Sequence, residues 1–404
     1  MIASSESVAV SKSAAIATKQ KVNELRKVFS AVEDPRSRRS MHSLLEMIFI
    51  AVAAAICGCN SWTDVELFGK RKLSWLRRFL KLENGIPSHD TFCRVFNLLN
   101  EDQMCRALVC WLEIIGANSG GRHIAIDGKS LRQSFDTATG TAMLHLVNAW
   151  CTDKGICFGQ HSVEEGSNEI AAVPKLLELI DINGATITLD AMHCQQATAR
   201  QIVERGADYV IAVKNNQSSL CDAITDAFAE AGKTPEAAAT AGLRTHTMAP
   251  PKGRTSDSRI NRIRRVCSVM PAPASLKKML PGLRTLVCIY REQHRSDSST
   301  DSSTEHITFF ASSLQPRARD HARLIRDHWK IENQLHWSLD VTFGEDHRRN
   351  RKHHGAAISG FISRLALSIL QQDTSLTKIS LRAKRKVCGW DSDALEAVLA
   401  SFST

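Results

Sequence analysis

The amino-acid sequence predicts an α/β fold in which helices cover a mixed β-sheet, and two observations predict it. Between residues 123 and 217, short apolar runs and helical segments follow the order strand, two strands, helix, strand, helix, strand. Such alternation is typical of layered α/β architectures. Residues 19–116, by contrast, carry apolar side chains at helical spacing, which predicts an all-α domain ahead of the sheet.

The helical segment at 19–116 contains the longest apolar run of the chain, Leu44–Cys59. Glu46 interrupts this run, which is too short to span a bilayer and therefore predicts a buried helix. Ser88 is placed to cap a further helix over Thr91–Leu99. Because basic residues lie along these helices, the segment is either a DNA-binding unit or a domain that only packs against the rest of the chain.

Three apolar runs in the next segment predict strands that end at charged residues. The runs and the residues after them are His123–Ile126 with Asp127, Ala185–Leu189 with Asp190, and Tyr209–Val213 with Lys214. A β-hairpin is expected over Leu144–Cys151 and Ile156–Val163. A helix is expected over Val173–Ile180, with Pro174 in its first turn.

Residues 218–319 depart from this rhythm. Two strand-like runs, Thr285–Tyr290 and His306–Ala311, flank a polar stretch rich in Ser, Thr and Asp at Arg295–Thr304. The polar stretch has no means of packing and predicts a loop. We therefore expect an insertion built on a small β-sheet.

A helical stripe follows at residues 320–404. Leu324, Ile331, Leu335 and Leu339 recur at intervals of 7, 4 and 4 residues, with Glu332 beside them. A carboxylate at the edge of a packing face needs a positive neighbour. Either Glu332 forms an ion pair with one of the nearby basic residues, or it holds a divalent cation together with acids from elsewhere in the chain. The basic candidates are His328, Lys330 and His336.

The net charge of +10 indicates a polyanionic partner, with nucleic acid ahead of an acidic membrane surface. Residues 315–386 hold 15 Lys and Arg against 7 Asp and Glu, which predicts a localised basic face. The twelve cysteines are scattered without CxxC pairs, as expected of free thiols in a reducing cytosol. Residues 1–18 are small and polar and predict disorder without the pattern of a secretion signal, so we expect a cytoplasmic protein without a membrane role.

Asp127 and Asp190 are candidates for one site because in open sheets the strand ends form the reactive edge. Two adjacent carboxylates repel and need a cation between them. Glu332 from a packed helix would complete an all-oxygen site for Mg²⁺ or Mn²⁺. Lys129, Lys214 and Arg326 would then contact phosphates. The alternatives are that Asp127 lies in a turn and that Asp190 only caps a helix.

Four segments resemble the DDE transposases of bacterial insertion sequences, in the branch that includes the H-repeat-associated proteins. They are IAIDGKSLRQSFD (124–136), SNEIAAVPKLLELIDINGATITLDAMHCQQ (167–196), GADYVIAVKNNQ (206–217) and HWKIENQLHWSLDVTFGEDHRRNR (328–351). Residues 34–62 and 85–100 resemble the transposase-associated domain of that branch.

This resemblance implies a ribonuclease-H-like catalytic core formed by residues 123–217 and 320–404, with the β-rich insertion at 218–319 between its parts. It places the acidic triad on Asp127, Asp190 and Glu332, and it implies that two Mg²⁺ or Mn²⁺ ions act in cutting and joining DNA. The implied partners are double-stranded DNA, as element ends and as target, and a second copy of the chain. The implied location is the bacterial cytoplasm, at the nucleoid.

Related cut-and-paste transposases carry a Tyr-x2-Arg-x3-Glu-x6-Lys signature, whose positions here are Ile325, His328, Glu332 and Leu339. Only the Glu is kept, and His328 with Arg326 is expected to replace the phosphate contacts. The charged tail that follows belongs to the pattern of the branch. Its Arg348 and Arg351 are candidate DNA contacts, whereas the roles of its acids stay open. These acids are Asp340, Glu345 and Asp346.

Two alternatives to a transposase remain open. One is a metal-dependent nuclease of the same fold that cuts without joining. The other is a catalytically silent DNA-binding remnant of a mobile element, which is favoured by the departure of Lys252–Arg259 from a Gly-Arg-x-Glu-x-Arg segment of the family.

Overall fold

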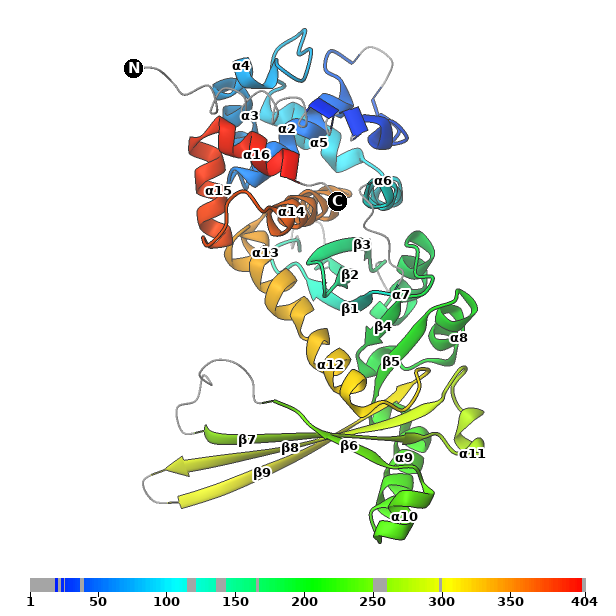
Figure 1. The fold of residues 1–404 in the computed structure, drawn as a ribbon. Coiled ribbons are helices and arrows are strands. Elements are labelled where there is room, and N and C mark those ends of the chain that lie inside the picture. Colours follow the sequence, from blue (N-terminus) through cyan, green and yellow to red (C-terminus); the bar gives the residue numbers. More distant parts are fainter. Residues whose placement is uncertain are drawn as a thin grey trace. The chain divides into compact units, whose positions relative to one another are not determined.

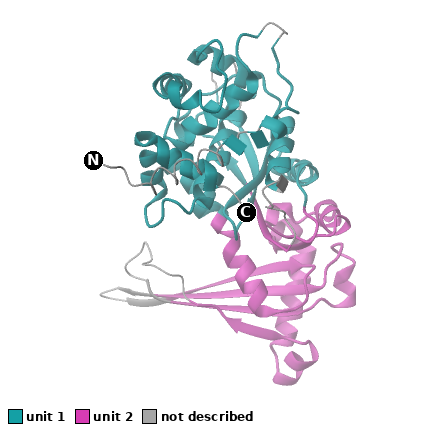
Figure 2. Cartoon of the chain, turned by 45° about the horizontal axis from the view of Figure 1, so that its top comes forward, with its two compact units in different colours: residues 1–118, 128–181, 331–404 teal, residues 119–127, 182–330 magenta. Residues whose placement is uncertain are grey.

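The computed structural model describes residues 19–20, 23–24, 26–36, 40–114, 121–135, 143–164, 167–249, 260–297 and 300–401. The predicted disordered segment 1–18 lies outside these residues. The chain divides into two compact units, shown in Figure 2. Unit 1 comprises residues 1–118, 128–181 and 331–404, and unit 2 comprises residues 119–127 and 182–330.

Unit 1 begins with the predicted helices. They are α2 (Leu44–Ile56), α3 (Trp62–Arg71), α4 (Leu73–Leu76), α5 (His89–Leu98) and α6 (Glu101–Ile114). Helix α2 is buried along most of its length, as its apolar run predicts. Ser88 caps α5, because its hydroxyl accepts a hydrogen bond from the Thr91 N–H at 3.3 Å. The all-α region expected from the sequence is confirmed (Figure 1).

The predicted hairpin of unit 1 is formed by β2 (His145–Cys151) and β3 (Ile156–Ser162), which pair antiparallel. Helix α7 (Glu169–Leu179) packs on both strands. The prediction for Pro174 was wrong, because it lies inside α7 and not in its first turn. The helix starts earlier than predicted, since the Asn168 side chain accepts a hydrogen bond from the Ala171 N–H and caps it.

The end of unit 1 is helical again. Its elements are α13 (Trp337–Val341), α14 (Gly355–Gln372), α15 (Leu381–Trp390) and α16 (Ser392–Ser401). Helix α14 is buried almost throughout and packs against α2, α6 and β3. The N-terminal helices and the C-terminal helices of this unit therefore share one core.

Unit 2 holds the parallel part of the sheet. Strand β1 (His123–Ser130) starts in this unit, and its last three residues belong to unit 1. Unit 1 also contains β2 and β3. In unit 2 the strand order is β1-β4-β5-β9-β8-β7-β6. Strands β4 (Thr186–Leu189) and β5 (Asp208–Val213) are parallel to β1 and are connected by α8 (Gln196–Glu204). The predicted mixed α/β sheet is confirmed.

The β-rich insertion of unit 2 is a long antiparallel ribbon (Figure 1). Its strands are β6 (Arg244–Thr247), β7 (Ile260–Pro271), β8 (Thr285–Asp297) and β9 (Thr300–Ser312), and its helices are α9 (Ser218–Ala231), α10 (Pro235–Thr240) and α11 (Ala274–Lys277). The loop predicted at Arg295–Thr304 was wrong, because β8 and β9 pair as far as Asp297 and Thr300. The ladder satisfies the backbone of these polar residues without an apolar core.

Helix α12 (Ala318–His328) packs on β4, β5, β6 and β7 of the same unit. A π-helical turn, Ile331–His336, follows it in the chain and leads into α13. The four leucine and isoleucine residues of the predicted stripe are all at most 3% exposed. This confirms the apolar stripe, although its helix is interrupted by a wider turn.

Glu101, the first residue of α6, gives unit 1 a pH-dependent contact. The Ser162 hydroxyl donates to its Oε1 at 2.6 Å, and burial raises the pKa of the Glu101 carboxyl to about 7. The folded state therefore binds a proton between the unfolded value of 4.5 and about 7. The stability that this proton contributes is complete below the lower value and is lost as the pH rises through about 7.

We predict that Glu101→Gln flattens the decline of the unfolding free energy between about pH 5 and pH 8, because the variant has no proton to lose there. Urea denaturation across this range measures the effect. Glu83→Gln, at an exposed position of the same unit, should follow the wild-type profile. Parallel profiles for wild type and Glu101→Gln would show that Glu101 does not titrate as described.

Candidate active site

Asp127 and Asp190 occupy adjacent positions on neighbouring parallel strands. Ile126 of β1 is the register partner of Leu189 of β4, and each aspartate is the next residue. Neighbouring strands lie about 4.8 Å apart. Both apolar partners are buried, so core packing fixes the register that brings the two acids together.

Asp127 lies inside β1, which continues to Ser130. The turn considered for this position is therefore excluded. The strand places the half-buried Asp127 side chain on the face opposite to that of Gly128.

Asp190 combines a cap with an open carboxylate. Its Oδ1 accepts a hydrogen bond from the Ala191 N–H at 2.6 Å, so the helix-cap interpretation holds for this atom. The Lys214 Nζ lies 3.5 Å from the same oxygen. The side chain of Asp190 is 48% exposed, and among the described residues no donor bonds its Oδ2. One oxygen thus stabilises the loop and the other is accessible to a ligand.

Two histidines converge on Thr188, which lies two residues before Asp190 and on the same strand face. The Thr188 Oγ1 is 2.8 Å from the His123 Nε2 and 2.8 Å from the His328 Nδ1. Burial lowers the pKa of His123 to about 3 and that of His328 to about 4, so both rings are neutral. These bonds fix the last turn of α12 to β4.

Glu332 is exposed and lies in the π-helical turn, four residues after His328. Such turns are rare and occur often at functional sites. Its neighbours Ile331 and Leu335 are buried, so packing holds the turn in place. Of the basic residues considered as ion-pair partners, Lys330 lies 3.3 Å from Asp327.

Lys129 is paired with the acids of the charged tail within unit 1. Its side chain is 7% exposed, and its Nζ donates to Asp340 at 2.6 Å and to Asp346 at 3.5 Å. Burial raises the pKa of Asp340 although Lys129 opposes the rise. Two acids whose roles the sequence left open are thus partners of a buried lysine.

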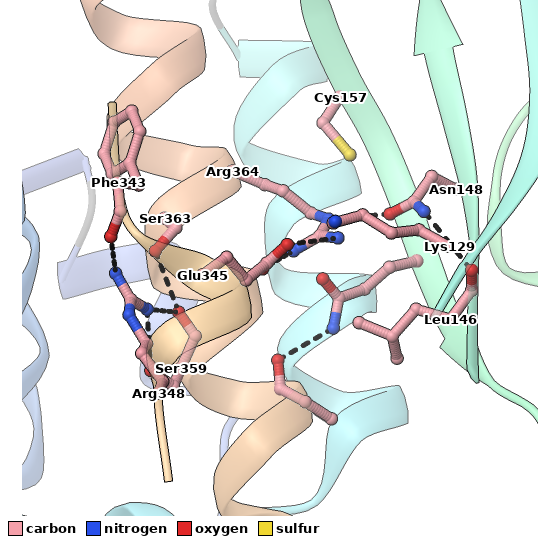
Figure 3. A network of polar contacts seen from close by, with 12 residues as sticks. Lys129, Leu146, Asn148, Cys157, Phe343, Glu345, Arg348, Ser359, Ser363 and Arg364 are labelled. Atoms are coloured by element: carbon pink, nitrogen blue, oxygen red, sulfur yellow. Dashed lines mark hydrogen bonds and ion pairs between the residues drawn. The ribbon is translucent and has the colours of Figure 1, made fainter. Parts of the chain in front are cut away.

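The third acid of the tail, Glu345, is part of a buried network shown in Figure 3. Its Oε1 accepts a hydrogen bond from the Arg364 Nη1 at 2.5 Å, and both side chains are at most 2% exposed. The Arg364 Nε donates to the Asn148 Oδ1 at 2.6 Å, which joins α14 to β2. Arg348 donates to the Ser359 Oγ at 2.8 Å. The network ties the tail to α14 and to the hairpin.

The six predicted DNA contacts fall into two groups. Lys214 and Arg326 have exposed side chains, at 62% and 48%. The other four are buried or half-buried and hydrogen-bonded within the protein, and they are Lys129, His328, Arg348 and Arg351. The guanidinium of Arg351 also lies over the Phe135 ring, 5.6 Å from its centroid.

The donor set for a metal is only partly assembled within unit 2. Among the described residues, no group of three or more His, Cys, Asp or Glu side chains is arranged to hold a metal ion. The aspartate pair supplies hard carboxylate oxygens, which fit Mg²⁺ or Mn²⁺ better than softer metals. The pair also has the repulsion that a cation between the two groups would relieve.

Comparison with known proteins places the chain in a family. Residues 118–369 match the family described as "Transposase DDE domain", and residues 26–112 match the family "DDE_Tnp_1-associated". The first match covers more than half of the chain. This protein belongs to the DDE transposase domain family.

Several of its relatives carry the names of transposases. It is 34% identical to "Putative transposase YncI" of Escherichia coli O157:H7 over 93% of this chain and 94% of that protein. It is 32% identical to "H repeat-associated putative transposase YhhI" of Escherichia coli K12 over 89% and 93% of the two chains. It is also 40% identical to "Inactive transposase YbfQ" of that strain, over 14% of this chain and 66% of that protein.

The sequence did not single out His123, Thr188, Asn148 or Arg364. A lone polar residue in an apolar strand or helix carries no signal of its own, because its partner lies far away in the chain. Arg364 and Asn148, for example, are 216 residues apart.

In the described part of the chain, no helix is long and apolar enough to cross a membrane.

We predict that Arg364→Met lowers the free energy of unfolding by about 3–5 kcal/mol, because it leaves the Glu345 carboxylate buried without its partner. Urea denaturation measures the loss. Removing both groups, in Glu345→Gln with Arg364→Met, should cost less than the single change. Arg132→Met is the control, because Arg132 is 81% exposed and pairs with Asp346 at 3.4 Å. Equal costs for Arg364→Met and Arg132→Met would contradict the assigned role.

Proposed function

We propose that this protein is a DNA transposase that binds the ends of a mobile element and performs metal-dependent cleavage and joining of DNA strands. The observation that carries the proposal is the register of β1 and β4, which sets Asp127 beside Asp190. Membership of the DDE transposase domain family supports it.

In this proposal, Asp127, Asp190 and Glu332 would hold two Mg²⁺ or Mn²⁺ ions. The chemistry supplied by the bound metal is Lewis-acid assistance to a phosphodiester displacement. Glu332 lies in the π-helical turn that follows α12 in the chain, and within unit 2 the bonds of Thr188 to His123 and His328 attach α12 to β4.

Lys214 and Arg326 are the proposed phosphate contacts with exposed side chains. Lys214 follows β5 and lies near Asp190, so a phosphate held there would be next to the carboxylate pair. Four other predicted contacts are buried or half-buried and hydrogen-bonded within the protein. We propose that they hold the segments that contact DNA in place. These residues are Lys129, His328, Arg348 and Arg351.

The proposed partner is double-stranded DNA, in agreement with the net charge of +10. Joining two element ends requires both to be held together, so we propose that two copies of the chain act on DNA. The proposed location is the cytoplasm, at the nucleoid.

A second candidate function is a silent DNA-binding protein left by a mobile element. The similarity to "Inactive transposase YbfQ" favours it. The altered segment Lys252–Arg259, which also favours it, lies outside the described residues. The nuclease alternative differs from the transposase in a single property, because it would not join pre-cut ends to a target.

We predict that Asp190→Ala lowers Mg²⁺-dependent cleavage of a labelled fragment carrying the element ends by about a thousandfold, since metal stabilisation is worth several kcal/mol. Duplex binding should stay within about threefold of wild type, because the change removes no cation. Asp222→Ala, at an exposed position of α9, is the matched control and should retain both activities.

The outcomes separate the candidate functions. Joined products from pre-cut ends support a transposase, whereas cleavage without joining indicates a nuclease. Binding without cleavage by the wild type indicates a silent remnant. Wild-type cleavage rates for Asp190→Ala would refute the assigned ligands.

A further inference from the structure

Three basic residues form a row across the β-rich insertion. Arg265 of β7 is the register partner of Arg291 of β8, and Arg291 is the register partner of His306 of β9. Residues directly opposite each other on antiparallel strands share a face, and like charges in such pairs are destabilising. The repulsion between the charges of the row therefore destabilises the folded state.

The row continues the face of the ribbon on which α12 packs. Along β7, Arg265 lies on the same face as Cys267 and Val269. Both are buried in the apolar cluster that includes residues of α12. Along β8, Arg291 shares its face with Val287 and Ile289 of the same cluster. Figure 1 shows the strands and the helix of this unit.

Among the described residues, no carboxylate is paired with the guanidinium group of Arg265 or of Arg291. The Nε atoms of Arg265 and Arg291 are buried, and within the described residues neither atom has a hydrogen-bond partner. Burial lowers the pKa of Arg265, and the charges of Arg291 and Arg326 lower it further. A third guanidinium, on α12, is thus close enough to act on the same site.

Arg326 forms a long ion pair with the neighbouring Asp327. Its Nε lies 3.9 Å from the Asp327 Oδ1, and the other oxygen of Asp327 is 3.3 Å from Lys330. Among the described residues, Asp327 is thus the one carboxylate paired with these arginines, and its contact with Arg326 is long. The guanidinium plane is suited to bidentate contacts with a phosphate.

The opposite face of the same strands provides a contrast. There Arg264 is the register partner of Glu292, and the Tyr290 hydroxyl is hydrogen-bonded to Glu305. Glu292 and Glu305 thus lie on the face of the ribbon opposite to the arginine row.

We propose that Arg265, Arg291 and His306, together with Arg326, form a binding site for the backbone phosphates of double-stranded DNA. The site rests on the proposed function and extends it, because it assigns the β-rich insertion a direct contact with the substrate. A row across three strands about 4.8 Å apart favours an extended polyanion over a single small anion.

The test is duplex binding as a function of salt, measured without divalent metal on the full chain. Arg265→Gln and Arg291→Gln should each bind about tenfold more weakly than wild type, with a salt slope smaller by about 1. Arg264→Gln, which removes the same charge from the other face, should bind within about twofold of wild type. The melting temperature of Arg265→Gln should equal or exceed that of wild type, because a repulsion is removed.

Three results would overturn the site. The first is binding by Arg265→Gln and Arg291→Gln that matches Arg264→Gln. The second is a fall in the melting temperature of Arg265→Gln, which would identify a structural arginine. The third concerns the rise in melting temperature that inorganic phosphate causes. A variant that loses this rise yet binds the duplex like wild type would assign the site to the free anion. Because no metal is present, a failure of cleavage leaves this test intact.

Discussion

The parallel pairing of β1 with β4 is the constraint on which the candidate site depends. Ile124, Ala125 and Ile126 of β1 and Ile187 and Leu189 of β4 are apolar and buried, so the register of the two strands is fixed by core packing. A shift of one residue would turn one of the two carboxylates to the other face of the sheet. The same core that stabilises the sheet thus determines the distance between the two acids.

The remaining polar residues near the two acids have distinct tasks. Thr188 and the two histidines attach α12 to β4, and the Ala191 N–H holds one oxygen of Asp190. In unit 1, Lys129 and Arg364 neutralise the acids of the charged tail. The acids of the tail are therefore engaged in ion pairs within unit 1. Glu332 precedes the tail in the π-helical turn and is exposed.

Much of the fold could be predicted from the sequence, because apolar runs that end in Asp127, Asp190 and Lys214 are local signals. The π-helical turn was not predictable, since the leucine spacing around Glu332 also fits an ordinary helix. The β8–β9 ribbon was missed because its stabilisation comes from a backbone ladder and not from apolar periodicity. The arginine row was missed because Arg265 and Arg291 meet only through strand register.

If the two strand-end aspartates form a divalent-cation site, the protein should bind Mn²⁺ directly. Electron paramagnetic resonance of Mn²⁺ titrated into wild type and Asp127→Asn measures bound ion without requiring DNA or turnover. We expect Mn²⁺ binding by wild type and an affinity at least about tenfold weaker for the variant, as is usual when metal coordination is disturbed. Equal Mn²⁺ affinity in the two proteins would contradict this assignment.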